Sequence, residues 1–272
     1  RRTIMKPRKI EKYLLKESKN KTLCITLLDS QITKLKSLPN LINTIEKSKV
    51  TAIFVGGSTI SDQAEIETLV NHINKLTKLP VILFPGNISG VASNADAILF
   101  MSLLNSENPY FITGAQALGA ITVKKLDIEA LPTAYIIIGD GGGAGFIGGA
   151  RGIPPDKPEI AGMYALAAEY LGMRFVYLES GSGAKNHIPI KTISTVRKLY
   201  TGFLMVGGGI KDAPTAKKIA KTGVDAIIIG SVLETSKYKT LLPKITKAIQ
   251  LKQLKLIAFI EIFAVFARSV FC

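Results

Sequence analysis

Cysteine and histidine are scarce in this sequence of 272 residues. The two cysteines, Cys24 in an apolar segment and Cys272 at the end, make neither a disulfide framework nor a zinc site, which favours a reducing cytoplasm. The two histidines, His72 and His187, lie far apart in the sequence, and no Gly-x-Ser-x-Gly turn occurs with a candidate histidine. This scarcity argues against a Cys/His metal centre and against a Ser/His/Asp hydrolase.

Blocks of like charge are also absent, although 35 Lys and Arg outnumber 20 Asp and Glu and give a net charge of +15. Aromatic residues do not alternate with the basic ones, so no nucleic-acid partner is expected. The charge fits attraction to anionic small molecules or to an anionic lipid surface. It fits a Lys-rich solvated surface equally well.

The sequence has no signal-peptide core and no clean membrane span. The basic, amphipathic start (1–18) lacks an apolar core, so we expect a cytoplasmic protein. The apolar tail (254–272) is interrupted by Glu261 and Arg268 and falls short of the ~20 apolar residues that a spanning helix needs. Packing on a partner subunit, peripheral membrane contact and an error in the gene's assigned end stay open for the tail.

Apolar strands and amphipathic helices alternate eight times along the chain, which is typical of a parallel sheet covered by helices. The pattern predicts a single-domain α/β fold, a modified (β/α)8 TIM barrel over 21–250, preceded by an N-terminal helix (1–20) and followed by the apolar tail (251–272). One barrel helix is expected to be missing, because the segment 88–96 after the third strand is too short for it. The predicted strands are 23–28, 51–55, 81–84, 97–101, 133–138, 175–178, 203–206 and 226–229. The predicted helices are 6–18, 38–47, 62–76, 112–123, 158–171, 189–199, 213–221 and 232–249.

Glycine-rich loops follow the seventh and eighth strands, at 206–210 and at 229–231. Each is predicted to turn from a strand into a helix, where bare backbone N–H groups and the helix dipole favour a phosphate. Two such loops in consecutive units match the phosphate grip of a (β/α)8 barrel. A third glycine-rich segment, 139–152, is expected to be a mobile loop, either a lid over the site or an ordinary surface loop.

Two carboxylates stand at predicted strand ends. Asp29 follows the first strand, next to the strand that ends at Ser58, and these hard oxygen ligands suit Mg²⁺ when a substrate phosphate and water complete its shell. The alternative role for Asp29 is to cap the turn that follows it. Glu179 follows the sixth strand and is placed to accept hydrogen bonds from sugar or polyol hydroxyls, or to pair with a lysine.

Several motifs occur together in one order: 177–183 (YLESGSG), 206–210 (VGGGI), 84–87 (FPGN) and 108–110 (NPY), with 131–135 and 157–161 in support. On these motifs the chain, over about 12–249, resembles the geranylgeranylglyceryl phosphate synthase family, which includes the heptaprenylglyceryl phosphate synthases.

The resemblance implies a Mg²⁺-dependent prenyltransferase that joins geranylgeranyl diphosphate to the C3 hydroxyl of sn-glycerol 1-phosphate, the first ether bond of archaeal phospholipids. It implies a homo-oligomer, catalytic roles for Asp29 and Glu179, and Mg²⁺ on Asp29 and Ser58. The acceptor would be bound by Tyr177, Leu178, Glu179, Ser180, Gly181, Ser182 and Gly183, and its phosphate by Gly208, Gly209, Gly230 and Ser231. The chain departs from the family at 30–32, where Ser-Gln-Ile replaces Pro-Asp-Lys and leaves the diphosphate contacts open.

Two other functions share these loops. One is a phosphate-binding barrel enzyme such as a sugar-phosphate isomerase, which would need an acid/base pair across the barrel mouth. The other is a non-catalytic protein that binds phosphate or a lipid headgroup. For a prenyltransferase, the thin region after the third strand is the expected opening of an apolar channel.

Overall fold

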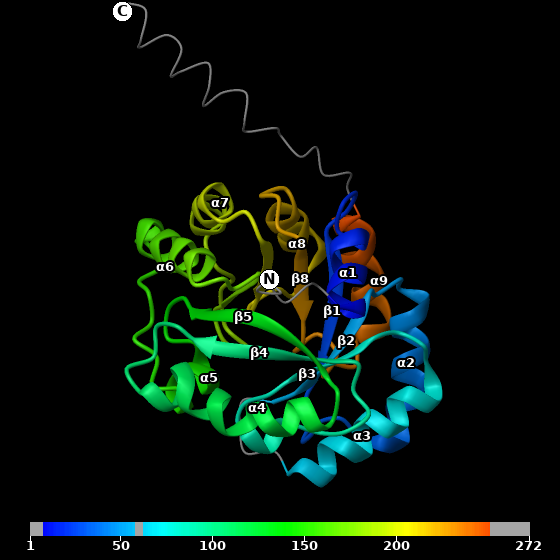
Figure 1. Cartoon of the computed structure of the whole chain (residues 1–272). Coiled ribbons are helices and arrows are strands. Elements are labelled where there is room, and N and C mark those ends of the chain that lie inside the picture. The colour runs from blue at the N-terminus through cyan, green and yellow to red at the C-terminus, as the bar shows by residue number, and fades with distance from the viewer. Residues whose placement is uncertain (1–7, 58–61, 251–272) are drawn as a thin grey trace, which may run out of the picture.

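Eight parallel strands close into a single barrel in the order β1 to β8 (Figure 1). The computed structural model describes residues 8–57 and 62–250. The strands are β1 Leu23–Leu28, β2 Ala52–Gly56, β3 Val81–Phe84, β4 Ala97–Leu103, β5 Glu129–Ile137, β6 Phe175–Glu179, β7 Phe203–Gly207 and β8 Ala226–Ile229. The predicted α/β barrel is therefore confirmed. Ser58 and the apolar tail (251–272) lie outside the described residues.

Helices surround the barrel. They are α1 Lys9–Glu17, α2 Leu38–Lys47, α3 Gln63–Leu76, α4 Ala115–Lys125, α5 Gly142–Ile147, α6 Pro158–Tyr170, α7 Ile190–Leu199, α8 Ala213–Ala220 and α9 Tyr238–Ile249, with the short turns η1 Leu35–Ser37, η2 Ile88–Gly90 and η3 Tyr110–Gly114. Between β3 and β4 only η2 is found, so the prediction of a missing barrel helix is confirmed. No helix in the described part of the chain is long and apolar enough to cross a bilayer.

The strands are buried on both faces, which explains their continuous apolar sequences. Alternate residues fill the inside of the barrel, such as Ile25 and Phe54, while Cys24 and Ile53 pack against the outer helices. Because side chains alternate along a strand, the residues that continue the inward series emerge at the barrel mouth.

Strand β5 begins at Glu129, four residues before the predicted start. Pro132, which lacks an N–H, led the prediction to begin after it. The structure accommodates the proline because residues 129–132 pair only with β4, and pairing with β6 starts at Thr133. The first part of β5 is thus a local edge, where a strand tolerates proline.

Two further segments differ from the prediction. Residues 139–152, predicted as a mobile loop, contain the helix α5 and are tied at their base by hydrogen bonds between Gly139 and Ile153 and from Asn105. The last helix begins at Tyr238 and not at Val232, because 230–235 form successive turns in which Gly230 O accepts from Leu233 N at 2.8 Å.

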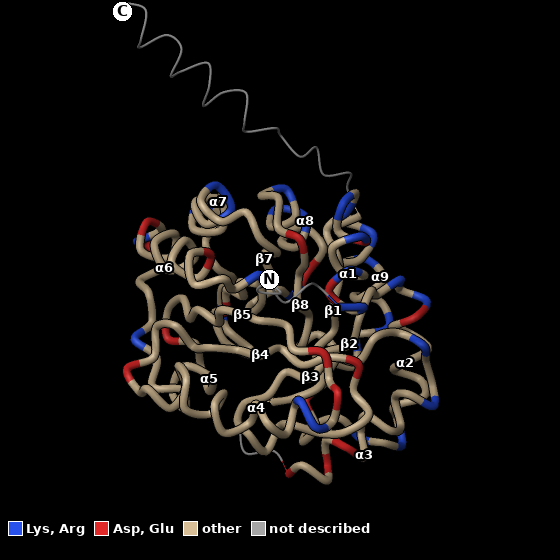
Figure 2. Tube along the Cα trace, viewed as in Figure 1, with Lys and Arg blue, Asp and Glu red and all other residues tan. Residues whose placement is uncertain are grey.

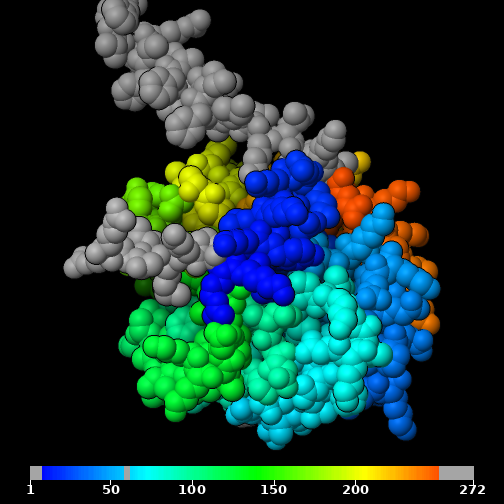
Figure 3. All heavy atoms as spheres, turned by 45° about the vertical axis from the view of Figure 1, so that its right-hand side comes forward, coloured from blue at the N-terminus to red at the C-terminus, as the bar shows by residue number. Residues whose placement is uncertain are grey.

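Helix α1 packs on the barrel where its strands begin, and it is visible in dark blue in Figure 3. The buried Glu129 carboxylate accepts hydrogen bonds from Ile10 N at 2.7 Å and Glu11 N at 2.9 Å. It thereby caps a helix whose own N-cap residue, Arg8, provides no side-chain hydrogen bond. The buried Glu11 in turn pairs with Arg174, at the start of β6.

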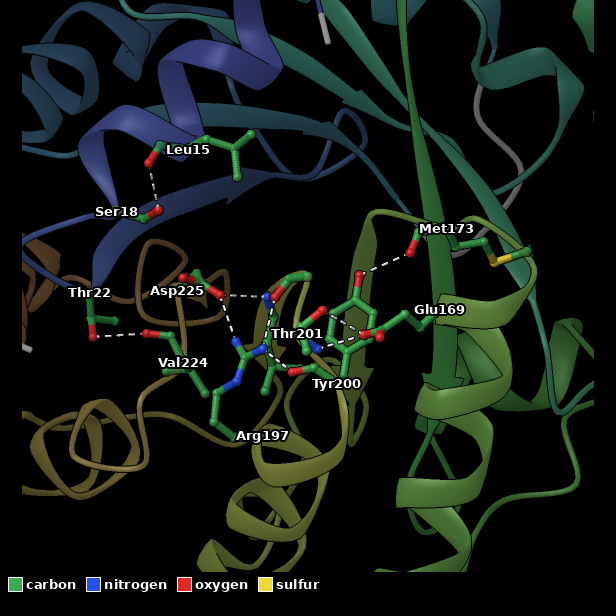
Figure 4. A network of polar contacts seen from close by, with 12 residues as sticks. Leu15, Ser18, Thr22, Glu169, Met173, Arg197, Tyr200, Thr201, Val224 and Asp225 are labelled. Carbon is green, nitrogen blue, oxygen red and sulfur yellow. Dashed lines mark hydrogen bonds and ion pairs between the residues drawn. The ribbon is translucent and has the colours of Figure 1, made fainter. Parts of the chain in front are cut away.

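A second polar network ties the chain segments that enter β7 and β8 (Figure 4). Arg197 donates to Asp225 at 2.8 Å and to the carbonyls of Tyr200 and Gly202. Asp225 also accepts from Leu204 N at 2.9 Å. These contacts close the end of the barrel remote from the strand carboxyl ends. On the outside, Lys and Arg are distributed over several helices with Asp and Glu among them (Figure 2).

Candidate active site

One cavity opens at the carboxyl ends of the strands. Asp29 after β1, Gly57 after β2, Glu179 at the end of β6 and Gly230 after β8 all line it, together with Ser182. Asp29 and Glu179 continue the inward series of their strands, which is why residues 150 positions apart meet at one mouth. The barrel mouth is where (β/α)8 enzymes carry their active sites.

Glu179 is 6% exposed and is held from two sides. Its Oε1 accepts from Gly181 N at 2.6 Å, and its Oε2 accepts from the Tyr177 hydroxyl at 2.9 Å. Burial raises the pKa of the Glu179 carboxyl above its ordinary value, against the lowering effect of these hydrogen bonds. No lysine contacts it among the described residues, so the simple ion pair that the sequence left open is not formed.

The side chains of the segment 177–183 do not all face the cavity. Tyr177 and Glu179 point inward, whereas the Leu178 side chain packs in the core between the barrel and its helices. Leu178 can therefore offer a ligand only its backbone. Ser182 lines the cavity, and Ser180 Oγ donates to Asn186 O at 3.4 Å.

The loop after β7 turns sharply through Gly208 and Gly209, whose φ angles are +81° and +66°. A Cβ on Gly208 would collide with Ser180 Oγ and Glu179 Oε1, so only glycine brings this backbone beside Glu179. Successive amides in such a turn form an anion-binding concavity.

The prediction that each loop leads into a helix holds after β7 and is wrong after β8. Helix α8 begins at Ala213 as predicted, and its N-cap residue Asp212 accepts a hydrogen bond from Thr215 N at 2.8 Å. After β8, Gly230 and Ser231 enter hydrogen-bonded turns and not an α-helix. Of the two loops, only Gly230 lines the cavity.

Asp29 is both a turn residue and a cavity residue. Its Oδ1 accepts from Gln31 N at 2.9 Å, as the turn-capping alternative predicted. Its Oδ2 accepts no hydrogen bond from a described residue and faces Gly57, where a Cβ would lie 2.8 Å away. The predicted partner Ser58 follows directly after Gly57.

Glu234 is a cavity residue that sequence reasoning missed. It lies in the turn after β8, and burial raises the pKa of its carboxyl, with the negative charge of Asp29 adding to the effect. Within the described lining, the ionisable acids and bases are Asp29, Glu179, Glu234 and the weakly acidic Tyr135, with no Lys, Arg or His. The only feature of the sequence that pointed to Glu234 was its position three residues after the Gly230-Ser231 loop.

A divalent cation fits this chemistry. No group of three or more metal-ligating side chains occurs in the described part of the chain, so the protein would supply few of the ligands. Mg²⁺ binds in this way when substrate phosphates and water complete its octahedron. Asp29 Oδ2, which has no hydrogen-bond partner among the described residues and no Lys, Arg or His beside it in the described lining, is a suitable oxygen ligand.

The other half of the cavity is apolar. It passes between η2, β4 and α4 and is lined by Val91, Ile98, Phe100, Phe111, Ala115 and Val123. Strands β3 and β4 pair only at Ile82–Ala97 and Leu83–Ile98, so the barrel wall opens above these pairs. The apolar groove thus leaves the mouth where the barrel helix is missing.

The motif 108–110 connects two segments that flank this groove. Asn108 Oδ1 accepts from Tyr110 N at 3.0 Å and starts the η3 turn, and the Tyr110 hydroxyl donates to Asn87 Oδ1 at 2.6 Å. The loop after β3 is thereby joined to the segment before α4. The α5 segment also lines the cavity, through Ala144, Ile147 and Gly148.

Comparisons with known proteins agree with these observations. The model of the PcrB family matches residues 16–249. The chain is 55% identical over 243 residues to the geranylgeranylglyceryl phosphate synthase of Nitrosopumilus maritimus, covering 89% of this chain and 97% of that protein. It is 48% identical to the enzyme of the same name from Pyrococcus horikoshii, covering 84% and 90%.

Solved structures give the same result. The structure of (S)-3-O-geranylgeranylglyceryl phosphate synthase from Thermoplasma acidophilum, in complex with its substrate sn-glycerol-1-phosphate, superposes with a TM-score of 0.84 at 34% identity, covering 87% of this chain and 96% of that one. A thiamine phosphate pyrophosphorylase from Pyrococcus furiosus, at 15% identity and a TM-score of 0.54 over 85% and 96%, shares the fold alone.

Proposed function

Because this chain belongs to the PcrB family, we propose that it is a prenyltransferase that joins a long prenyl diphosphate to the C3 hydroxyl of sn-glycerol 1-phosphate. The observation that carries the proposal is the cavity itself, with carboxylates at the barrel mouth and an apolar groove leading away from them. An isoprenoid chain fits the groove, and two phosphorylated ends meet at the mouth. We propose a geranylgeranyl chain, because the relatives are named geranylgeranylglyceryl phosphate synthases.

The acceptor is proposed to lie between β6 and β8. Backbone amides of the loops at Gly208–Gly209 and Gly230–Ser231 hold its phosphate, because turned glycine backbones present N–H groups to anions. Glu179 accepts a hydrogen bond from the acceptor's hydroxyl end. Its two present donors, Gly181 N and Tyr177, fix the carboxylate in place for this role.

The donor diphosphate is proposed to lie across the mouth, next to β1 and β2. Asp29 and Ser58 would hold Mg²⁺ there, and the ion would neutralise the charge that builds on the departing diphosphate. The acidic mouth supports this proposal, since Asp29 and Glu234 alone would repel a diphosphate.

The transfer is a substitution at C1 of the prenyl chain. A lone pair of the C3 oxygen forms the new bond to C1 of the prenyl chain, while the C1–O bond breaks and its electron pair leaves with the diphosphate. The hydroxyl proton passes to Glu179. The raised pKa of this carboxyl suits proton acceptance, because general bases work best with a pKa near the working pH.

Incubation with sn-glycerol 1-phosphate, Mg²⁺ and prenyl diphosphates of several lengths, followed by mass analysis, tests the proposal. We expect an ether product only when all three are present. Asp29→Asn should remove most activity, and Glu179→Ala should chiefly weaken use of the acceptor. Binding of sn-glycerol 1-phosphate without any product would indicate a phosphate-binding protein. Turnover of a sugar phosphate without a prenyl donor would indicate an isomerase.

A further inference from the structure

Tyr135 stands at the boundary between the polar and apolar halves of the cavity. It points inward from β5 and is only 7% exposed, yet it lines the cavity. Its ring packs edge-on against Phe84 at 5.7 Å and against Tyr177 at 5.3 Å between centroids. Both contacts fix the ring, so its hydroxyl has a defined position.

The Tyr135 hydroxyl makes no hydrogen bond to any described residue. By contrast, the hydroxyls of Tyr13, Tyr110, Tyr177 and Tyr200 each donate to an oxygen. Tyr135 lines the cavity, so a ligand there could supply the partner that no described residue supplies. A site that binds a polar ligand needs such a free hydrogen-bonding group. The unpartnered hydroxyl of Tyr135 in the cavity therefore points to a hydrogen bond with a ligand.

The strand order of the barrel indicates which ligand group the Tyr135 hydroxyl binds. In the closed order β1 to β8, β5 lies next to β6, which carries Glu179, and opposite β1, which carries Asp29. The diphosphate is assigned to the Asp29 side and the acceptor phosphate to the loops after β7 and β8. The prenyl chain itself has no hydrogen-bonding atom. Only the acceptor's two hydroxyls remain for Tyr135.

Of these two, the C3 hydroxyl is the nucleophile, and the proposed function already assigns it as the hydrogen-bond donor to Glu179. A donor bound to its oxygen would withdraw the electron density that must attack C1. We propose, on the basis of the proposed function, that the Tyr135 hydroxyl binds the C2 hydroxyl of the glycerol phosphate and makes this residue a determinant of acceptor specificity.

The assignment has a stereochemical consequence, since C2 is the stereocentre of the acceptor. With the phosphate on the glycine loops and the reacting hydroxyl on Glu179, the enantiomer sn-glycerol 3-phosphate must direct its C2 hydroxyl away from Tyr135. A site built around a substrate hydroxyl rejects a compound that leaves the site's polar group unpaired. Tyr135 therefore favours one enantiomer.

Calorimetric titration of the full chain with three ligands tests this inference. They are sn-glycerol 1-phosphate, sn-glycerol 3-phosphate and 1,3-propanediol monophosphate, which lacks the C2 hydroxyl. Tyr135→Phe keeps the ring and removes the hydroxyl. We expect it to weaken binding of sn-glycerol 1-phosphate by roughly threefold to tenfold, the value of one neutral hydrogen bond, and to leave the propanediol compound unchanged. Discrimination between the enantiomers should fall by the same factor.

Tyr13→Phe is the matched control, because its hydroxyl bonds to Thr51 O beneath the barrel, away from the cavity. It should bind all three ligands as the wild type does. Equal affinity of the wild type for sn-glycerol 1-phosphate and the propanediol compound would overturn the inference, and this comparison needs no variant. So would unchanged affinities in a folded Tyr135→Phe variant.

The two proposals fail in different ways. A wild type that forms the ether product but shows no preference for the C2 hydroxyl overturns only the role of Tyr135. A wild type that prefers sn-glycerol 1-phosphate but forms no product overturns only the transferase function. A wild type that does not bind sn-glycerol 1-phosphate overturns both.

Discussion

Gly57→Ala should impair the magnesium-dependent step through a single methyl group. A Cβ at this position lies 2.8 Å from Asp29 Oδ2 and 3.1 Å from its Cγ. Ordinary van der Waals contact begins near 3.4 Å, so the carboxylate must move by about 0.6 Å or rotate. Either movement competes with the 2.9 Å hydrogen bond from Gln31 N to Oδ1. Misplacement of about 1 Å in a reacting group costs on the order of 10²-fold, so we expect kcat/KM to fall roughly 10- to 100-fold.

The assay is the rate of ether formation against Mg²⁺ concentration. Gly57→Ala should raise the concentration needed for half-maximal rate, with little change in the unfolding midpoint. Gly119→Ala is the control, because it adds the same methyl to the apolar part of the cavity, where the nearest atom is 4.0 Å away. It should leave the Mg²⁺ requirement unchanged. A Gly57→Ala enzyme with wild-type rate and Mg²⁺ requirement would refute the placement of the metal at Asp29.

Three further predictions concern Glu179, Gly208 and Glu129. Because burial raises the pKa of Glu179, kcat/KM should fall as pH drops through a value above the ordinary ~4.3, and Glu179→Gln should remove that acid limb in a pH–rate profile. Gly208→Ala should weaken calorimetric binding of sn-glycerol 1-phosphate by at least tenfold, since its methyl collides with Glu179; unchanged binding would contradict the site. Glu129→Gln should cost about 1–3 kcal/mol of unfolding free energy in urea, because the α1 cap loses its charge and one acceptor, whereas the exposed Asp127→Asn control should stay within about 0.5 kcal/mol.

The barrel was predictable from the sequence because its signals are local. Apolar strands such as 81–84 and 226–229 are short, continuous and bounded by polar or glycine residues, and both have the predicted bounds in the structure. The missing helix was also predictable, because the segment 88–96 is too short to contain a barrel helix. Asp29 and Glu179 could be selected because strand ends in a barrel converge by topology.

Other features depend on contacts that no local pattern records. The cap of α1 comes from Glu129, more than a hundred residues away in the chain. The glycine content of 139–152 predicted a loop without a helix of its own, described above as mobile, but a helix forms within it, and tertiary hydrogen bonds from Asn105 to Ile137 and Arg151 hold its base. Tyr135 belongs to the motif 131–135, but the sequence does not show that its hydroxyl has no hydrogen-bond partner among the described residues and lies in the cavity.

The absence of one helix links the fold to the proposed chemistry. A barrel helix after β3 would cover the outer side of β3 and β4, and its loss should expose residues such as Ile98. Instead Ile98 stays buried, because Val91 from the η2 region and Val123 from α4 pack in the same core cluster. Phe100 lies two residues after Ile98 in β4, is only partly buried and lines the groove. The core is therefore closed at the level of Ile98. An apolar path remains at the level of Phe100, beyond the last residue pair between β3 and β4. Under the proposed function, a long isoprenoid would supply the packing that the missing helix would have supplied, and a closed barrel would thereby accommodate an extended substrate.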